Sequence, residues 1–209
     1  MDLNVRCVTA DCSDFPKVLR TGSKASVYSQ IWAIGDLAIL DRPLLGLVCS
    51  IRCPGDVILK TYDMIQALRE QGVPIIGGFH SPMEKDCLDI LLRGTQPIVI
   101  CPARGLSTMQ LPVKWRKGIK DGQLLILSIF EPKHKRLSAP LAEKRNQFVA
   151  DICTRLFIPH ASSKSKTEKL AYDQITKGKT IYTLDLPSNT YLKEVGIAAV
   201  KINHKWDTI

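Results

Sequence analysis

The sequence predicts an α/β fold, in which a mainly parallel, doubly wound sheet is covered by helices on both faces, the three-layer Rossmann-like arrangement. From about residue 44 onward, short apolar runs alternate with amphipathic segments of helical period. The runs are apolar throughout, as expected of strands that are buried on both faces. Strand–helix alternation also implies crossover connections, which make neighbouring strands parallel and place helices on both sides of the sheet.

The first elements carry the clearest local signals. Residues 44–51, LLGLVCSI, form the first predicted strand, and the helix after it ends at Gly72. The next helix opens with Ser81 as N-cap and with Glu84 three residues after it, the pattern of a capping box. The remaining strands are expected at 73–79, 96–103, 124–130, 156–161, 180–185 and 198–202, and the remaining helices at 111–122, 138–153, 164–178 and 189–195.

The first 42 residues do not follow the alternation. The segments DFPKVL (14–19) and SVYSQIWAIGDLAIL (26–40) suggest a helix and short strands packed on the main domain. The sequence therefore predicts an N-terminal extension over residues 1–42 and a Rossmann-like domain over residues 43–209.

Composition narrows the class of protein. Apolar residues make up 45% of the chain, no apolar run is long enough for a membrane span, and the N-terminus has no signal-peptide pattern. Seven cysteines without a C-x-x-C pair predict reduced thiols, a cytoplasmic location and no metal site, although Cys49 and Cys53 have the spacing of half a site. The net charge of +9 permits nucleic acid, nucleotides or an anionic surface as partner.

The position of the charge is more informative than its amount. Ligands of open parallel sheets bind beyond the carboxyl ends of the strands, and five successive strands are followed there by a cation, a histidine or both. In chain order, these turns carry Ser50 and Arg52; Gly77, Gly78 and His80; Arg104; Lys133, His134, Lys135 and Arg136; and His160, Ser163, Lys164, Ser165, Lys166 and Thr167. Because helix N-termini point to the same edge, we expect an anion-binding rim with phosphate as its natural guest.

The last of these turns, within RLFIPHASSKSKTEKL (155–170), is expected both to cap a helix and to face the anion. Ser162 or Ser163 is the expected cap, which leaves Lys164 and its neighbours free for phosphate. Neither a Walker loop nor a G-x-G-x-x-G fingerprint is present, which argues against a dinucleotide-dependent dehydrogenase, and we expect no cofactor.

The order of these segments resembles the DprA/Smf family of DNA-processing proteins, within the SLOG group of Rossmann-like domains. LLGLVCSIRCPG (44–55) is similar to the family's V-A-I-V-G-S-R strand and turn, and VPIIGGFHSPMEKDCLDILLRG (73–94) to its V-V-S-G-x-A-x-G-I-D-x-x-A-H segment. PLAEKRNQFVADI (140–152) resembles F-x-x-R-N-R-I-I-x-x-L and matches Arg145 and Asn146. IPHASSKSKTEKLA (158–171) resembles V-E-A-x-x-x-S-G-[ST]-x-x-T-A, with Pro159-His160 in place of the glutamate and a replaced glycine.

The resemblance implies a non-enzymatic protein that binds single-stranded DNA at this rim, hands it to a RecA-type recombinase in DNA uptake and transformation, and forms a homodimer. No catalytic residue is expected. The implied and deduced binding residues are Ser50, Arg52, Gly77, Gly78, His80, Arg104, Arg145, Asn146, Ser163, Lys164, Ser165, Lys166 and Thr167.

Two other functions stay open at this point. Related SLOG proteins are phosphoribohydrolases that cleave nucleoside monophosphates, and Thr167-Glu168 is an echo of their P-G-G-x-G-T-x-x-E turn. A nucleotide sensor is the other alternative, and the sequence does not separate DNA, RNA and free nucleotide as ligand. Phe79, Trp115 and Phe130 could stack on bases but are expected in the core, and His80 and His160 are expected to hydrogen-bond loops rather than to react.

Overall fold

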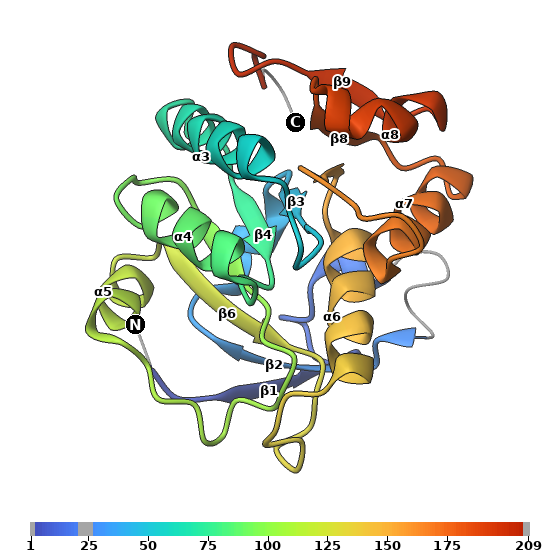
Figure 1. The fold of residues 1–209 in the computed structure, drawn as a ribbon. Helices are drawn as coiled ribbons and strands as arrows, with labels where there is room; N and C mark the ends of the chain where they lie inside the picture. The colour runs from blue at the N-terminus through green and yellow to red at the C-terminus, as the bar shows by residue number, and fades with distance from the viewer. Residues whose placement is uncertain (1–2, 21–26, 207–209) are drawn as a thin grey trace.

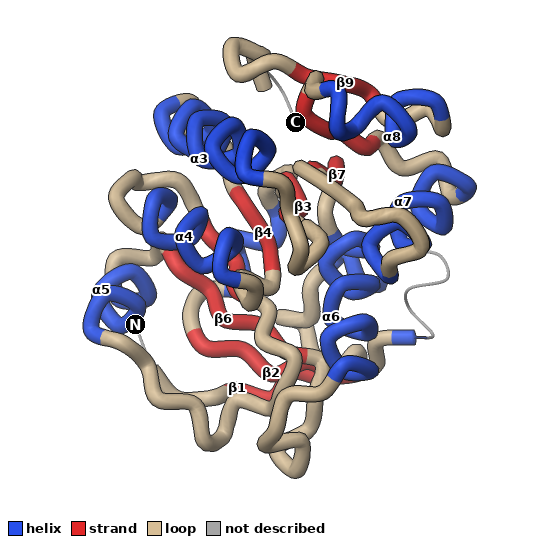
Figure 2. The backbone as a smooth tube through the Cα atoms, viewed as in Figure 1, coloured by secondary structure: helices blue, strands red, loops and turns tan. Residues whose placement is uncertain are grey.

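The protein folds around one mixed sheet with helices on both faces, as a computed structural model shows for residues 3–20 and 27–206 (Figures 1 and 2). The strands are β1 (Arg6–Thr9), β2 (Gln30–Ile34), β3 (Leu45–Leu47), β4 (Ile75–Gly77), β5 (Ile98–Ile100), β6 (Leu124–Ser128), β7 (Arg155–Phe157), β8 (Ile181–Leu184) and β9 (Ala198–Val200). The helices are α1 (Lys17–Arg20), α3 (Gly55–Glu70), α4 (Pro82–Leu91), α5 (Val113–Lys120), α6 (Ala139–Ile152), α7 (Lys166–Thr176) and α8 (Thr190–Glu194), with the 3-10 helices η1 (Leu37–Asp41) and η2 (Pro187–Asn189). The predicted fold class is confirmed.

The sheet order is β1-β2-β6-β5-β4-β3-β7-β8-β9, and every pair from β6 to β9 is parallel. The chain builds outward from β3 through β4 and β5 to β6, and then outward on the other side from β7 to β9. The junction of β3 and β7 is therefore the switch point at which successive connections turn to opposite faces, and such a point opens a crevice beyond the strand ends.

The N-terminal strands continue the same sheet. β1 pairs antiparallel with β2, and β2 pairs antiparallel with β6, so the two strands form one edge. The division of the chain at residue 42 stays a prediction, but residues 6–9 and 30–34 belong to the sheet of the main domain.

Two hydrophobic cores fill the space between the layers. Helices α3, α4 and α5 cover one face, where Met64 and Ile65 are fully buried. Helices α6, α7 and α8 cover the other, where Phe148 of α6 is 1% exposed. The strands are shorter than the apolar runs because each run continues past its strand: Val48 and Cys49 follow β3 and remain buried under the helices.

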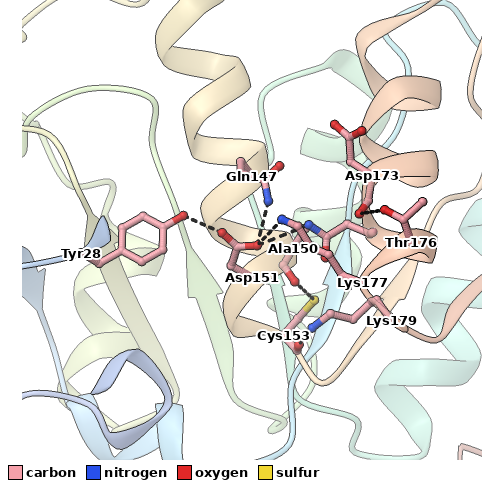
Figure 3. Close-up of polar contacts among 10 residues, drawn as sticks. Tyr28, Gln147, Ala150, Asp151, Cys153, Asp173, Thr176, Lys177 and Lys179 are labelled. Carbon is pink, nitrogen blue, oxygen red and sulfur yellow. Dashed lines mark hydrogen bonds and ion pairs between the residues drawn. The ribbon is translucent and has the colours of Figure 1, made fainter. Parts of the chain in front are cut away.

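A polar cluster at the carboxyl end of α6 holds this helix to its neighbours (Figure 3). The Asp151 carboxylate accepts hydrogen bonds from Tyr28 Oη at 2.8 Å, Gln147 Nε2 at 2.7 Å and Gln174 Nε2 at 3.3 Å, and Lys177 Nζ lies 3.7 Å away. One carboxylate thus links the segment before β2, α6 and the end of α7. These contacts hold α6 in position against its neighbours.

We expect the Tyr28→Phe variant to lose about 1.5–3 kcal/mol of unfolding free energy, because Tyr28 donates to a partly buried carboxylate. Urea unfolding followed by circular dichroism measures this loss. The matched control is Tyr172→Phe, because Tyr172 is 42% exposed and its change should stay within about 0.5 kcal/mol. Equal midpoints for the two variants would show that the Tyr28 hydrogen bond contributes nothing net.

Within the described residues, no helix is long and apolar enough to cross a bilayer, and no group of His, Cys, Asp or Glu side chains is arranged to hold a metal ion.

Candidate nucleic-acid interface

A cavity of about 650 Å³ opens at the switch point between β3 and β7. It is lined by the loops after β3, β4 and β7, by Ala103 after β5, and by residues of α6 and α7. The first turns of α4, α6 and α7 contribute Ser81, Ser138 and Ser165 to the lining, each the N-cap of its helix. The positive ends of three helix dipoles therefore lie at the cavity, which favours an anion.

The structure brings most of the predicted residues to this cavity. Those that line it are Ser50, Arg52, His80, Arg145, Asn146, Ser165, Lys166 and Thr167. Those that do not line it are Gly77, Gly78, Arg104, Ser163 and Lys164. Gly78 lies beneath the cavity floor, and Lys164 lies in the loop at its mouth, whereas Arg104 follows β5, two strands away from β3.

Serine side chains tie the loop after β3 to the loop after β7. Ser50 Oγ accepts from the Ser162 N–H at 2.9 Å and donates to Ser165 Oγ at 3.3 Å. Ser162 Oγ donates to the Arg52 carbonyl at 3.2 Å. The two loops thus hold each other in place, and each carries an exposed cation, Arg52 in one and Lys164 in the other.

The cap of α7 is Ser165, so the expectation of Ser162 or Ser163 as cap is wrong. Ser165 Oγ accepts from the Glu168 N–H at 3.1 Å, and Glu168 in turn accepts from the Lys164 N–H at 2.6 Å. Ser162 instead bridges to the loop after β3. With several serines in one turn, the helix begins one turn later than the first hydroxyl suggests.

Lys164 adopts a left-handed backbone conformation with φ of +58°. This region favours glycine, and a residue with a side chain pays about 1–2 kcal/mol to enter it. The Glu168 carboxylate on the Lys164 N–H helps to hold the turn. The exposed Lys164 side chain makes no ion pair with any described residue, so its charge stays available to a ligand.

Arg145 forms part of the cavity floor and is only 4% exposed. Its Nη1 donates to the Cys101 carbonyl at 3.0 Å, and its Nε donates to Asn146 Oδ1 at 2.7 Å. Burial lowers the pKa of Arg145, and the Glu84 carboxylate opposes that shift. A guanidinium remains charged under these conditions, so Arg145 brings a fixed positive charge to the base of the cavity.

The absence of a side chain at Gly78 leaves room for the Arg145 guanidinium. A Cβ at Gly78 would lie 1.6 Å from Arg145 Nη1, so any other residue would displace the arginine. The predicted close approach at Gly78 is therefore an approach of Arg145, not of a ligand.

Glu84 is a cavity residue that sequence reasoning assigned only to helix capping. It is 6% exposed, and the capping box with Ser81 is present as predicted. Its Oε2 accepts from the N–H groups of His80 at 3.0 Å and Ser81 at 3.1 Å, and its Oε1 accepts from Cys49 N–H at 3.2 Å. One carboxylate thereby joins the loops after β3 and β4. No local pattern in the sequence indicates the hydrogen bond between Glu84 and the Cys49 N–H.

His160 and the aromatic residues have the structural roles expected of them, whereas the role expected of the His80 ring stays a prediction. His160 is 8% exposed, and its Nδ1 hydrogen-bonds Asn189 Oδ1 at 3.0 Å. Phe79 and Phe130 are each 5% exposed and belong to the core, and Trp115 packs against the core while remaining partly exposed. The seven cysteines all lie among the described residues and form no disulfide.

Charged groups of both signs line the mouth. Arg52 and Lys169 are exposed and make no ion pair with any described residue. Lys166 instead binds Glu143 of α6, with Nζ and Oε2 2.6 Å apart. The free cations, the buried arginine and the helix N-termini together make a concave surface suited to phosphate groups.

Comparisons with known proteins agree with this description. The DNA processing protein A of Streptococcus pneumoniae superposes with a TM-score of 0.77 at 17% identity, over 94% of this chain and 71% of that one. The DNA processing protein A of Helicobacter pylori, whose structure is described for a single-stranded DNA binding mode, gives 0.70 at 17% identity, over 94% and 90% of the two chains. A molybdenum cofactor binding protein of Rippkaea orientalis gives 0.53 at 10% identity, over 77% and 91%.

At sequence identities this low, the structural matches support the fold alone. No curated protein sequence matches the chain at a significant level. The family model of the DNA recombination-mediator protein A, in contrast, matches residues 6–198, nearly the whole sequence. The chain therefore belongs to the DNA recombination-mediator protein A family, as its order of motifs predicts.

Proposed function

We propose that this protein binds single-stranded DNA in the cavity at the β3–β7 junction and holds it without cleaving it. The observation that carries the proposal is the gathering of Arg52, Arg145 and Lys169 with three helix N-termini around one cavity. Backbone phosphates are the ligand that such a surface recognises, with weak dependence on sequence. The single-stranded DNA binding described for the Helicobacter pylori relative supports the same ligand.

Exposed apolar side chains favour a single strand over a duplex. Ile51 is 77% exposed and Leu137 is 50% exposed, and both line the cavity beside its cations. Apolar surface beside phosphate-binding groups suits unstacked bases, which a duplex keeps inside its helix. His80 is the one aromatic ring among the described residues that line the cavity, so we propose that the aliphatic side chains beside it also contact the bases.

A binding role suits the site better than a hydrolase role. The carboxylate that echoes the phosphoribohydrolase turn, Glu168, accepts the Lys164 N–H at 2.6 Å and does not line the cavity. The buried carboxylate of Glu84 accepts three backbone N–H groups and is thereby committed to the loops. Both carboxylates are thus engaged by backbone groups of this chain.

The family adds finer parts to the proposal. We include transfer of the strand to a RecA-type recombinase, a role in DNA uptake, homodimerisation and a cytoplasmic location. Sedimentation analysis and a strand-exchange assay with a RecA-type recombinase test the first and third of these directly.

The test of the proposed function is fluorescence anisotropy with a single-stranded DNA, its duplex, the matching RNA and an abasic oligonucleotide of equal charge, over a salt series. We expect the single-stranded DNA to bind most tightly, with the abasic strand several-fold weaker, and log affinity to fall linearly with log salt. Equal affinity for all four polymers would reduce the site to a general polyanion surface. Free base released from nucleoside monophosphates would instead support the hydrolase.

A further inference from the structure

One ion pair in the cavity stands where a ligand anion would be expected. Glu143 of α6 and Lys166 of α7 both line the cavity and bind each other across the groove between the helices, at 2.6 Å. Lys166 is the first residue of α7, so the Glu143 carboxylate lies near the positive end of that helix. A phosphate would bind favourably at this same position, because a cation and a helix N-terminus both stabilise a bound anion.

A second lysine reinforces the position. Lys166 lowers the pKa of Glu143, and Lys169, one turn further along α7, adds a smaller effect in the same direction. Lys169 also lines the cavity, and it makes no ion pair with any described residue. Two cations on one face of α7 therefore act on a single acidic side chain.

Three carboxylates line the cavity, those of Glu84, Glu143 and Asp173, and the first two differ in how firmly they are held. Glu84 is 6% exposed and hydrogen-bonded to three backbone N–H groups, so it cannot leave. The side chain of Glu143 is 46% exposed, and that of its partner Lys166 is 60% exposed. Exposed ion pairs are weak and are readily exchanged for another anion.

We infer that Glu143 is a built-in counter-anion of the cavity, which occupies Lys166 in the free protein and gives it up to a strand phosphate on binding. This inference rests on the proposed function and deepens it. Glu143 is then a residue that sets affinity: it reduces how tightly the cavity holds a polyanion and keeps binding reversible. It also lowers the number of phosphate contacts that the salt dependence of binding reports. The bound strand releases a cation, but the displaced Glu143 carboxylate takes up a cation from solution.

The experiment compares wild type with Glu143→Gln in anisotropy titrations of one single-stranded DNA over a salt series. We expect Glu143→Gln to bind about threefold to tenfold more tightly at low salt. We expect its log-affinity against log-salt slope to steepen by about 0.7, the value for one more phosphate contact of a single strand. Glu143→Asp, which keeps the charge, should stay close to wild type in both measures.

Glu70→Gln is the matched control for net charge. Glu70 is 60% exposed and pairs with Arg69 at the carboxyl end of α3, at the opposite edge of the sheet from the cavity. If Glu70→Gln tightens binding as much as Glu143→Gln, or if Glu143→Gln leaves affinity and slope unchanged, the inference is overturned. Absence of single-strand binding in the wild type as well would instead overturn the proposed function, which separates the two failures.

Discussion

The Arg52→Ala/Lys164→Ala double variant is expected to bind single-stranded DNA about a hundredfold more weakly at low salt, because each lost charged contact is worth about tenfold. Both cations are exposed and without an ion pair to any described residue, and their loops are tied together through Ser50 and Ser162. The slope of log affinity against log salt should flatten by about 0.7 for each lost contact.

The measurement is the same anisotropy salt series, with Arg93→Ala/Lys120→Ala as the control. These two exposed residues lie at the carboxyl ends of α4 and α5, so the control removes the same charge at the far edge of the sheet. Alanine at position 164 has a left-handed cost like that of lysine, which keeps folding effects small. Binding with unaltered affinity and slope in the double variant would contradict the assignment of this mouth to phosphate.

The Gly78→Ala variant is expected to lose about 2–4 kcal/mol of unfolding free energy, the largest effect of a single methyl group near the cavity. The new Cβ would lie 1.6 Å from Arg145 Nη1 and would drive the guanidinium away from the Cys101 carbonyl. A buried charge that loses its partners costs more than an ordinary hydrogen bond. Chemical denaturation with a tryptophan or circular dichroism signal measures the loss.

Gly55→Ala provides the contrast for this prediction. A Cβ at Gly55 meets nothing within 4 Å, and Gly55 is the first residue of α3, where alanine is the better helix former. We expect Gly55→Ala to be neutral or to stabilise by about 0.4–1 kcal/mol. Similar stabilities for Gly78→Ala and Gly55→Ala would show that Arg145 has room to move and that its position is not held by Gly78.

The fold could be predicted because strands buried on both faces and amphipathic helices leave strong periodic signals. The run at 44–51 and the capping box of Ser81 and Glu84 each placed an element correctly. The predicted strands extend beyond the observed ones, because buried residues continue past the last paired residue, as at Val48.

The candidate site could be predicted only in part, because the order of strands in a sheet is not written in the local sequence. Arg104 and the basic loop after β6 lie on the predicted edge of the sheet, but β5 and β6 lie two and three strands away from β3. Their basic side chains do not line the cavity, whereas the neighbouring residues Ala103 and Leu137 do. The spacing of residues likewise could not show that Arg145 lies against Gly78 or that Glu84 reaches Cys49.

The left-handed turn at Lys164 has a consequence for engineering the protein. Selection for thermal resistance alone would favour glycine there, since glycine relaxes the backbone, and it would discard the charge at the mouth in the same step. Stabilised variants of this chain therefore need to be tested for ligand binding, because glycine at position 164 would raise stability and weaken binding at the same time.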